Sequence, residues 1–127
     1  MPCGEKITHY TSVPEEPVPE EMATGTTIRW LISDKDGASN FYMRMFRMEP
    51  GAHIKAHFHP WEHEIYVLGG SGRVRIGSST YDVTEGTVVY IPPNVVHEYW
   101  SGDNGLIFLC IIPARPTAEK TERPLEC

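Results

Sequence analysis

Three histidines with the spacing of metal ligands lie in one short stretch of the chain and restrict how it can fold. His57 and His59 are two residues apart, so on a strand their side chains lie on the same face, with Cα atoms roughly 6.6 Å apart. Pro60 cannot donate a hydrogen bond to a strand ladder and marks a break, and His63 follows shortly after it. The simplest fold brings this third imidazole to the first two on a neighbouring strand, around one ion.

A fourth ligand has to come from a distant part of the sequence, because one hairpin supplies only one side of a coordination sphere. His97 is the candidate, since it follows an apolar strand and a tight turn at residues 92–94. We interpret His9 and His53 as structural or surface residues, because an isolated histidine more often forms ordinary hydrogen bonds. One divalent transition metal ion per chain is therefore expected, and imidazole suits zinc, copper, iron and nickel, with manganese also compatible. The predicted ligands are His57, His59, His63 and His97.

Short apolar segments between glycine and proline turns predict an all-β fold. Roughly nine strands are expected, among them residues 26–33, 41–49 and 106–112, and no segment has the period of a helix. Turns are expected at residues 49–51 and 69–72. Such a chain forms a sandwich or a barrel. Both faces of 41–49 and of 106–112 are apolar, more than one small barrel needs, so we expect a homodimer.

The 127 residues divide into one predicted domain and two flanking segments. Residues 26–113 are expected to form the barrel. Residues 1–25 are expected to form an extended, solvated arm, because residues 13–21 contain three prolines and four glutamates, which disfavour a core strand. Residues 114–127 are expected to form a polar tail.

The net charge of −6 argues against a nucleic acid as partner, because no cluster of lysine and arginine is present to neutralise phosphates. No apolar run approaches the roughly 18 residues that a membrane span needs. The start of the chain has no apolar leader, and its three cysteines have no metal-type spacing. A cytoplasmic protein with free thiols and a small-molecule substrate is therefore expected.

The histidines also belong to two motifs that resemble those of the cupin superfamily. The first family motif reads G-x5-H-x-H-x3,4-E-x6-G. Gly51, His57, His59 and Gly70 match it, and His63 occupies the position of the glutamate.

The second family motif reads G-x5-P-x-G-x2-H-x3-N. Gly86, Pro92 and His97 match it, whereas Asn94 replaces the inner glycine and Ser101 replaces the last asparagine. The change to asparagine is mild, because this residue tolerates a left-handed turn conformation.

The resemblance covers roughly residues 26–113 and implies a cupin-type double-stranded β-helix, or jelly-roll barrel, with the histidines pointing into its lumen. His63 in place of the glutamate further resembles a subgroup of small cupins that hold manganese or another divalent ion by four histidines. The resemblance therefore favours Mn²⁺ or Fe²⁺, with Zn²⁺, Ni²⁺ or Cu²⁺ as alternatives.

The spacing of the first motif selects His63 rather than Glu64 as the third ligand. Six residues separate the position of the glutamate from the last glycine of the motif, and six residues lead from His63 to Gly70. Neighbouring side chains on a strand point to opposite faces, so only one of the two residues can face the lumen. We expect Glu64 on the outer face, where it can pair with a cation.

Four neutral imidazoles leave the charge of the ion uncompensated, which favours anionic ligands such as enolates, carboxylates and reduced dioxygen. Our first hypothesis is a dioxygenase-type oxidoreductase acting on a small molecule. The alternatives are a metal-dependent isomerase or lyase, and a protein that binds a small carboxylate through its metal without turnover. A hydrolytic triad has little support, because no serine or cysteine lies in a nucleophile-elbow pattern.

Three further residues are candidate catalytic residues. Tyr99 shares a strand face with His97. Arg44 can clamp a carboxylate if it faces the lumen, but an exposed position fits the sequence equally well. Cys110 lies on the last apolar strand, where it is either a small core residue or part of the site.

Overall fold

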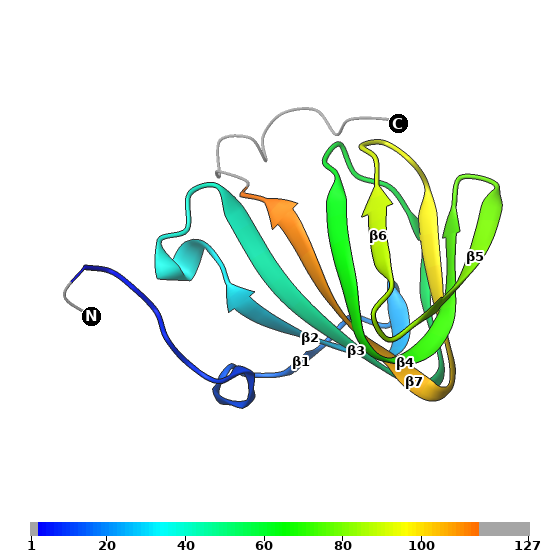
Figure 1. Cartoon of the computed structure of the whole chain (residues 1–127), viewed down its shortest axis with the longest axis horizontal. Helices are drawn as coiled ribbons and strands as arrows, with labels where there is room; N and C mark the ends of the chain where they lie inside the picture. Colours follow the sequence, from blue (N-terminus) through cyan, green and yellow to red (C-terminus); the bar gives the residue numbers. More distant parts are fainter. Residues whose placement is uncertain (1–2, 115–127) are drawn as a thin grey trace.

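Three long strands form the frame of the molecule: β3 (Phe41–His57), β4 (His63–Ile76) and β7 (His97–Pro113). In this computed structural model, which describes residues 3–114, β7 lies between the other two and pairs with both in antiparallel fashion. Figure 1 shows how these strands bend around a common interior. The predicted all-β class is confirmed, because strands make up nearly all of the regular structure.

The shorter elements extend the sheet at its edges. Its strand order is β1-β2-β3-β7-β4-β5, and β6 pairs with β4. These elements are η1 (Tyr10–Ser12), β1 (Glu16–Pro17), β2 (Ala23–Ile32), η2 (Asp34–Asp36), β5 (Ser79–Thr84) and β6 (Val88–Ile91). In the part of the chain that the structure describes, no helix has the length and apolar character needed to cross a membrane.

The turns predicted at residues 49–51 and 69–72 are wrong, because both segments lie inside long strands. The pairing register shifts there instead, between Met48 and His53 on β3 and twice between residues 67 and 72 on β4. Glycine favours a turn and a β-bulge for the same reason, its freedom of backbone conformation. The bulges bend each strand, so that one strand contributes to both sides of the barrel.

Gly72 on β4 lies between two neighbouring strands that approach it closely. It pairs with Val83 on β5 and with Ser101 on β7. A Cβ atom at this position would lie 2.2 Å from the carbonyl oxygen of Trp100 and 3.2 Å from the Cα of Ser101. Both contacts involve backbone atoms, which cannot move aside as a flexible side chain can.

We therefore predict that Gly72→Ala lowers the free energy of unfolding by about 1 to 3 kcal/mol, the range expected for overpacking. Urea denaturation followed by circular dichroism measures the change. Gly69→Ala is the matched control, because no atom lies within 4 Å of a Cβ atom added there. Equal stability losses in the two variants would contradict the close approach.

The outer face of the sheet carries large apolar side chains. Tyr66 lies opposite Val88, and Glu64 lies opposite Tyr90, so these residues share one surface of β4 and β6. Val88 is 74% exposed, and Phe41 on β3 is 67% exposed. A homodimer that covers this face stays a prediction.

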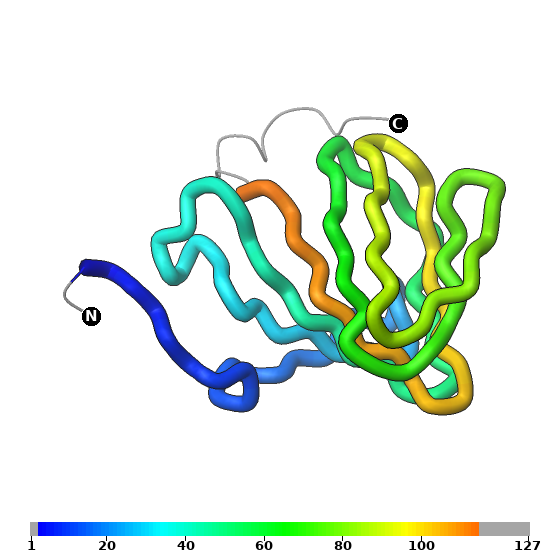
Figure 2. Tube along the Cα trace, in the orientation of Figure 1, coloured from blue at the N-terminus to red at the C-terminus, as the bar shows by residue number. Residues whose placement is uncertain are grey.

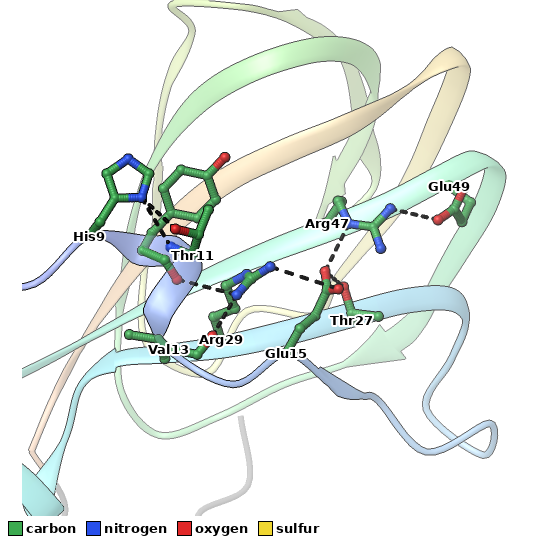
Figure 3. A network of polar contacts seen from close by, with 9 residues as sticks. His9, Thr11, Val13, Glu15, Thr27, Arg29, Arg47 and Glu49 are labelled. Atoms are coloured by element: carbon green, nitrogen blue, oxygen red, sulfur yellow. Dashed lines mark hydrogen bonds and ion pairs between the residues drawn. The ribbon is translucent and has the colours of Figure 1, made fainter.

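The N-terminal arm is fastened to the outside of β2 and β3 by a network of charged residues (Figure 3). Glu15 accepts hydrogen bonds from Thr27 at 2.6 Å and from Arg47 at 2.8 Å. The hydrogen bond with Arg47 is the main reason why the pKa of Glu15 falls to about 2. Arg29 donates to the backbone carbonyls of Tyr10 and Val13 and so holds the short helix η1.

The arm then turns back into the barrel. Figure 2 shows this segment running below β2 before the chain enters that strand. Val18 donates to the carbonyl of Thr26 at 3.0 Å, and the amide of Lys55 donates to the carbonyl of Met22 at 2.9 Å. Strand β2 begins at Ala23 rather than at residue 26. The division into arm, barrel and tail stays a prediction, and the tail lies almost wholly outside the described residues.

Candidate metal centre

The four candidate ligands meet at one end of the barrel, where three strands begin or end. His57 is the last residue of β3, His63 is the first of β4, and His97 is the first of β7. His57 and His97 are direct partners in the β3–β7 ladder. His59 lies in the connection from β3 to β4, and its carbonyl accepts a hydrogen bond from the amide of Asn94 at 2.6 Å. Asn94 has a φ of 68°, the left-handed conformation that asparagine tolerates.

The imidazole rings form one cluster. The ring centroids of His57 and His97 are 4.3 Å apart, and those of His57 and His59 are 4.8 Å apart. The ring of His63 lies 4.8 Å from that of His97. Within residues 3–114, the group whose ligand atoms all lie within 4.8 Å of one another consists of His57, His59 and His97. His63 borders this group, and its role as the fourth ligand stays a prediction.

Backbone carbonyls fix the tautomers of two imidazoles. Nδ1 of His57 lies 2.7 Å from the carbonyl oxygen of Lys55, and Nδ1 of His97 lies 2.9 Å from that of Val95. A carbonyl oxygen only accepts hydrogen bonds, so each Nδ1 carries the hydrogen and each Nε2 keeps its lone pair. This tautomer is the one in which Nε2 can bind a metal ion.

Two of these nitrogens are buried without a protein partner. Nε2 of His63 and Nε2 of His97 form no hydrogen bond to any described residue. A buried polar atom left in this state costs about 1 to 3 kcal/mol, so native proteins rarely keep one without a use. Together with the neighbouring ligand atoms, these lone pairs fit a divalent transition metal ion, and their imidazoles are the donors that such ions prefer.

Cys110 and Arg44 surround the other nitrogen of His63. Its Nδ1 lies 3.1 Å from Cys110 Sγ and 3.3 Å from Arg44 Nη2, and the same Nη2 donates to Cys110 Sγ at 2.9 Å. Arginine can only donate, so a hydrogen on Nδ1 must point to the sulphur. In that tautomer Nε2 of His63 keeps its lone pair for the cluster.

Burial keeps these imidazoles neutral. Loss of hydration lowers the pKa of His97 from 6.5 to about 4 and that of His63 to about 2, where the positive charge of Arg44 adds to the effect. The pKa of His57 is lowered for the same first reason, the loss of hydration. Neutral imidazoles are the form that binds metal, so the fold prepares the cluster for a cation.

The cluster opens into a cavity of about 420 Å³. Its walls include Trp30, Phe46, Tyr99 and Phe108, and the ring of Phe108 stacks on Phe46 and on Tyr99 at 5.2 Å in both cases. A larger hollow of about 740 Å³ lies near Arg73, but its walls hold no histidine among the described residues. We therefore assign the site to the smaller, aromatic cavity.

All three candidate catalytic residues line this cavity. The sequence was compatible with either an exposed or a lumenal position for Arg44, and in the structure Arg44 faces the lumen. Burial raises the pKa of Tyr99 well above 10 and also raises the pKa of Cys110, so the phenol and the thiol both keep their hydrogens. Their catalytic roles stay predictions.

Two parts of the site could not be predicted from the sequence pattern that indicated the histidines. Trp61 stacks on His59, with centroids 4.7 Å apart and planes 3° from parallel. Because Trp61 follows His59 by two residues, strand alternation could have placed it on the same side as His59. Val18 and Met22 of the N-terminal arm also line the cavity, and nothing in the polar sequence of the arm indicated this.

The other two histidines lie outside the cluster. His9 caps the short helix η1, and its Nδ1 lies 2.7 Å from the hydroxyl of Thr11. His53 stacks on Trp100 and lies 2.6 Å from Glu98. Both have the structural roles that the sequence suggested.

Glu64 points away from the cavity, as expected from strand alternation. His63 is buried, whereas Glu64 is exposed. No cation pairs with Glu64 among the described residues, and Glu62 lies beside it. Loss of hydration and a hydrogen bond with Glu62 raise the pKa of Glu64 to about 7.

Comparisons with known proteins agree with this geometry. Residues 44–112 match a protein family described as Cupin domain. The solved structure of the polyketide cyclase RemF from Streptomyces resistomycificus has a TM-score of 0.82 and is 37% identical. The match covers 87% of this chain and 80% of RemF.

Two curated proteins are similar over shorter stretches. The mannose-1-phosphate guanylyltransferase RfbM of Salmonella typhimurium is 41% identical over 64 residues, which are 49% of this chain and 13% of RfbM. Protein SchB of Streptomyces halstedii is 29% identical over 84 residues, which are 65% of this chain and 61% of SchB. The chain therefore spans less than two thirds of either relative.

A pair of substitutions tests the ligand set. We predict that His63→Ala lowers metal affinity about 100-fold or more, whereas Glu64→Gln keeps it near normal, because only His63 faces the cluster. Elemental analysis after dialysis measures metal content, and circular dichroism verifies that both variants fold. Loss of metal from Glu64→Gln alone would contradict this ligand set.

The lowered pKa values predict acid sensitivity of the metal-free protein. Below pH 6.5 the unfolded chain binds protons that the buried histidines cannot, so stability falls as the pH drops toward the folded-state value. With a pKa of about 4, His97 alone removes about 2 kcal/mol between pH 7 and pH 5. Urea denaturation at both pH values should show a smaller loss for His97→Gln than for the unchanged protein. Identical losses would mean that burial does not lower the pKa of His97 in the folded protein.

Proposed function

The chain belongs to the cupin family, with the jelly-roll barrel that its sequence predicts. From this premise we propose that it is a metal-dependent cyclase, which closes a ring within a small substrate made of alternating carbonyl and methylene groups. This reaction involves no redox step, like the metal-dependent isomerase or lyase that the sequence suggested as an alternative to the dioxygenase.

One observation carries the proposal: the chain is similar to the polyketide cyclase RemF over most of its length. The cavity supports it, because its walls are largely aromatic and apolar. Such walls suit a flexible, weakly polar chain that becomes planar as it cyclises. The partial likeness to SchB is compatible with this proposal but adds no chemistry to it.

A divalent ion fits the cluster of His57, His59 and His97, with His63 as the proposed fourth ligand. When bound, such an ion acts as a Lewis acid that favours the enolate form of a carbonyl compound. Its identity as manganese or iron, the four-histidine subgroup and a cytoplasmic location are likewise proposals.

The protein's own side chains contribute apolar packing surfaces and a hydrogen-bond donor. Tyr99 lines the cavity with a phenol that stays protonated, so its hydroxyl can donate to a substrate oxygen. Phe46 and Phe108 form an apolar wall against which a planar enol can pack. Trp61 covers one face of His59 and so keeps solvent from that imidazole.

The proposed reaction balances within one molecule. A proton leaves a methylene carbon, a carbon–carbon bond forms to a carbonyl carbon further along the chain, and that carbonyl oxygen takes up a proton. Loss of water then leaves an aromatic ring. These steps require no oxidant, and this distinguishes the cyclisation from the dioxygenase-type reaction.

The test uses a linear triketone whose intramolecular aldol condensation yields a dihydroxybenzene and water. We predict that the metal-loaded protein forms this product without consuming oxygen, and that Tyr99→Phe lowers the rate about 10- to 100-fold. Liquid chromatography measures the product, and an oxygen electrode runs in parallel. Tyr90→Phe is the matched control, because this tyrosine lies on the exposed outer face.

Oxygen consumption with the triketone, without cyclised product, would contradict the cyclase and favour the dioxygenase-type reaction. Tight binding of a dicarboxylate without any turnover would favour the third hypothesis, a protein that only binds its ligand.

A further inference from the structure

We propose that the substrate is a β-keto acid, an anion whose carboxylate is bound by Arg44 while its carbonyl groups face the histidine cluster. This inference rests on the proposed function for the chemistry at the histidines and adds the charge that the substrate carries. It assigns Arg44 a binding role that the cyclase chemistry alone does not require.

Arg44 differs from the other described arginines because it has no carboxylate partner. In the described part of the chain, every other arginine lies within 4 Å of a carboxylate, whereas Arg44 forms no ion pair. The paired arginines are Arg29 and Arg47 with Glu15, Arg73 with Asp82, and Arg75 with Glu98. An arginine kept in a cavity without a counter-ion is available for an anionic ligand.

The surroundings of Arg44 hold its guanidinium in place without neutralising it. The guanidinium carbon lies 5.0 Å from the ring centroid of Phe46 and 5.7 Å from that of Trp30, so two aromatic rings flank it. Its Nη2 donates to Cys110, a neutral thiol, and its Nε is buried without a hydrogen-bond partner among residues 3–114. Unused donors therefore remain on a cation that is already oriented.

The net charge of the cavity favours an anion. Lys55 and Glu21, both exposed, offset one another among the described lining residues, which leaves Arg44 as the uncompensated cation. A divalent ion on the cluster adds two further positive charges. An anionic substrate offsets this excess, whereas a neutral substrate leaves it in place.

The position of Arg44 limits how far the carboxylate lies from the reacting carbonyls. Its Nη2 is 3.3 Å from Nδ1 of His63, so the guanidinium borders the histidine cluster directly. A ligand that reaches both needs its carboxylate only a few bonds from its carbonyl oxygens. A β-keto acid has this arrangement.

A pair of probes of similar size and shape, one anionic and one neutral, tests the inference. Benzoylacetate is a β-keto acid, and benzoylacetone replaces its carboxylate by a neutral methyl ketone. We expect isothermal titration of the metal-loaded protein to show tighter binding of benzoylacetate. Arg44→Met should weaken benzoylacetate binding about 10- to 100-fold and leave benzoylacetone binding within about twofold.

Two further variants complete the experiment. Arg44→Lys should recover part of the affinity for benzoylacetate, because it keeps the positive charge but loses the planar pair of donors. Arg73→Met is the matched control: it removes an exposed arginine that pairs with Asp82, away from the arm and the cavity, and should not change either affinity. Elemental analysis of each variant shows whether the metal is still bound.

Equal losses for both probes in Arg44→Met, or no preference for benzoylacetate in the unchanged protein, would overturn the inference. The first result would mean that Arg44 only supports His63 and Cys110. Failure of the cyclase is a separate result, because binding is measured without turnover. A protein that prefers benzoylacetate through Arg44 but leaves the triketone uncyclised would refute the cyclase and keep the carboxylate site.

Discussion

The site depends on the double pairing of β7, which hydrogen-bonds to β3 along one edge and to β4 along the other. Its first residue, His97, and its later residue Cys110 both lie against His63. A straight strand would hold residues 97 and 110 roughly 40 Å apart. The strand therefore has to curl around the lumen, and the close backbone approaches at Gly72 and Gly105 are what allow it to do so.

Burial keeps the imidazoles of the cluster ready to bind a metal ion, but it also costs them their hydration. Imidazoles held in an apolar lumen lose hydration, which lowers the pKa of each and keeps its lone pair free. Arg44 strengthens this effect on His63, since a neighbouring positive charge opposes protonation. The fold thus holds neutral donors beside a fixed cation, and this combination selects for ligands that bring negative charge with them.

Sequence reasoning succeeded where the relevant physics is local. The alternation of side chains on a strand puts His63 and Glu64 on opposite faces, and the spacing of the first motif selects His63 as the inward residue. The structure has this arrangement. The left-handed conformation of Asn94 follows from its residue type and its place in a turn. The all-β class follows from the strand periods and the turn residues, because both are visible in short windows of sequence.

It failed where the outcome depends on a distant partner. The glycine-rich residues 69–72 suit a turn and a bulge equally, and only the pairing with β5 and β7 decides for the bulge. The alternation of side chains along β3 could not tell which face of the strand Arg44 occupies. Its neighbours in the ladders, Trp30 on β2 and Cys110 on β7, settle that it faces the lumen. The polar sequence of the arm likewise says nothing about the cavity wall, because that contact depends on the bend of β3, which the arm does not encode.

The arm separates the residues that shape the cavity wall from the strands that hold the histidines, two functions that many binding sites place on the same elements. The histidines stand on or between the framework strands, whereas Val18 and Met22 border the cavity from a short segment outside them. That segment is joined to the barrel by few backbone hydrogen bonds, such as the one from Lys55 to the carbonyl of Met22. Its side chains can therefore change without disturbing the ladders that hold the imidazoles. A lineage of such proteins can then acquire new substrate preferences by drift in the arm while it keeps one inherited chemistry in the barrel.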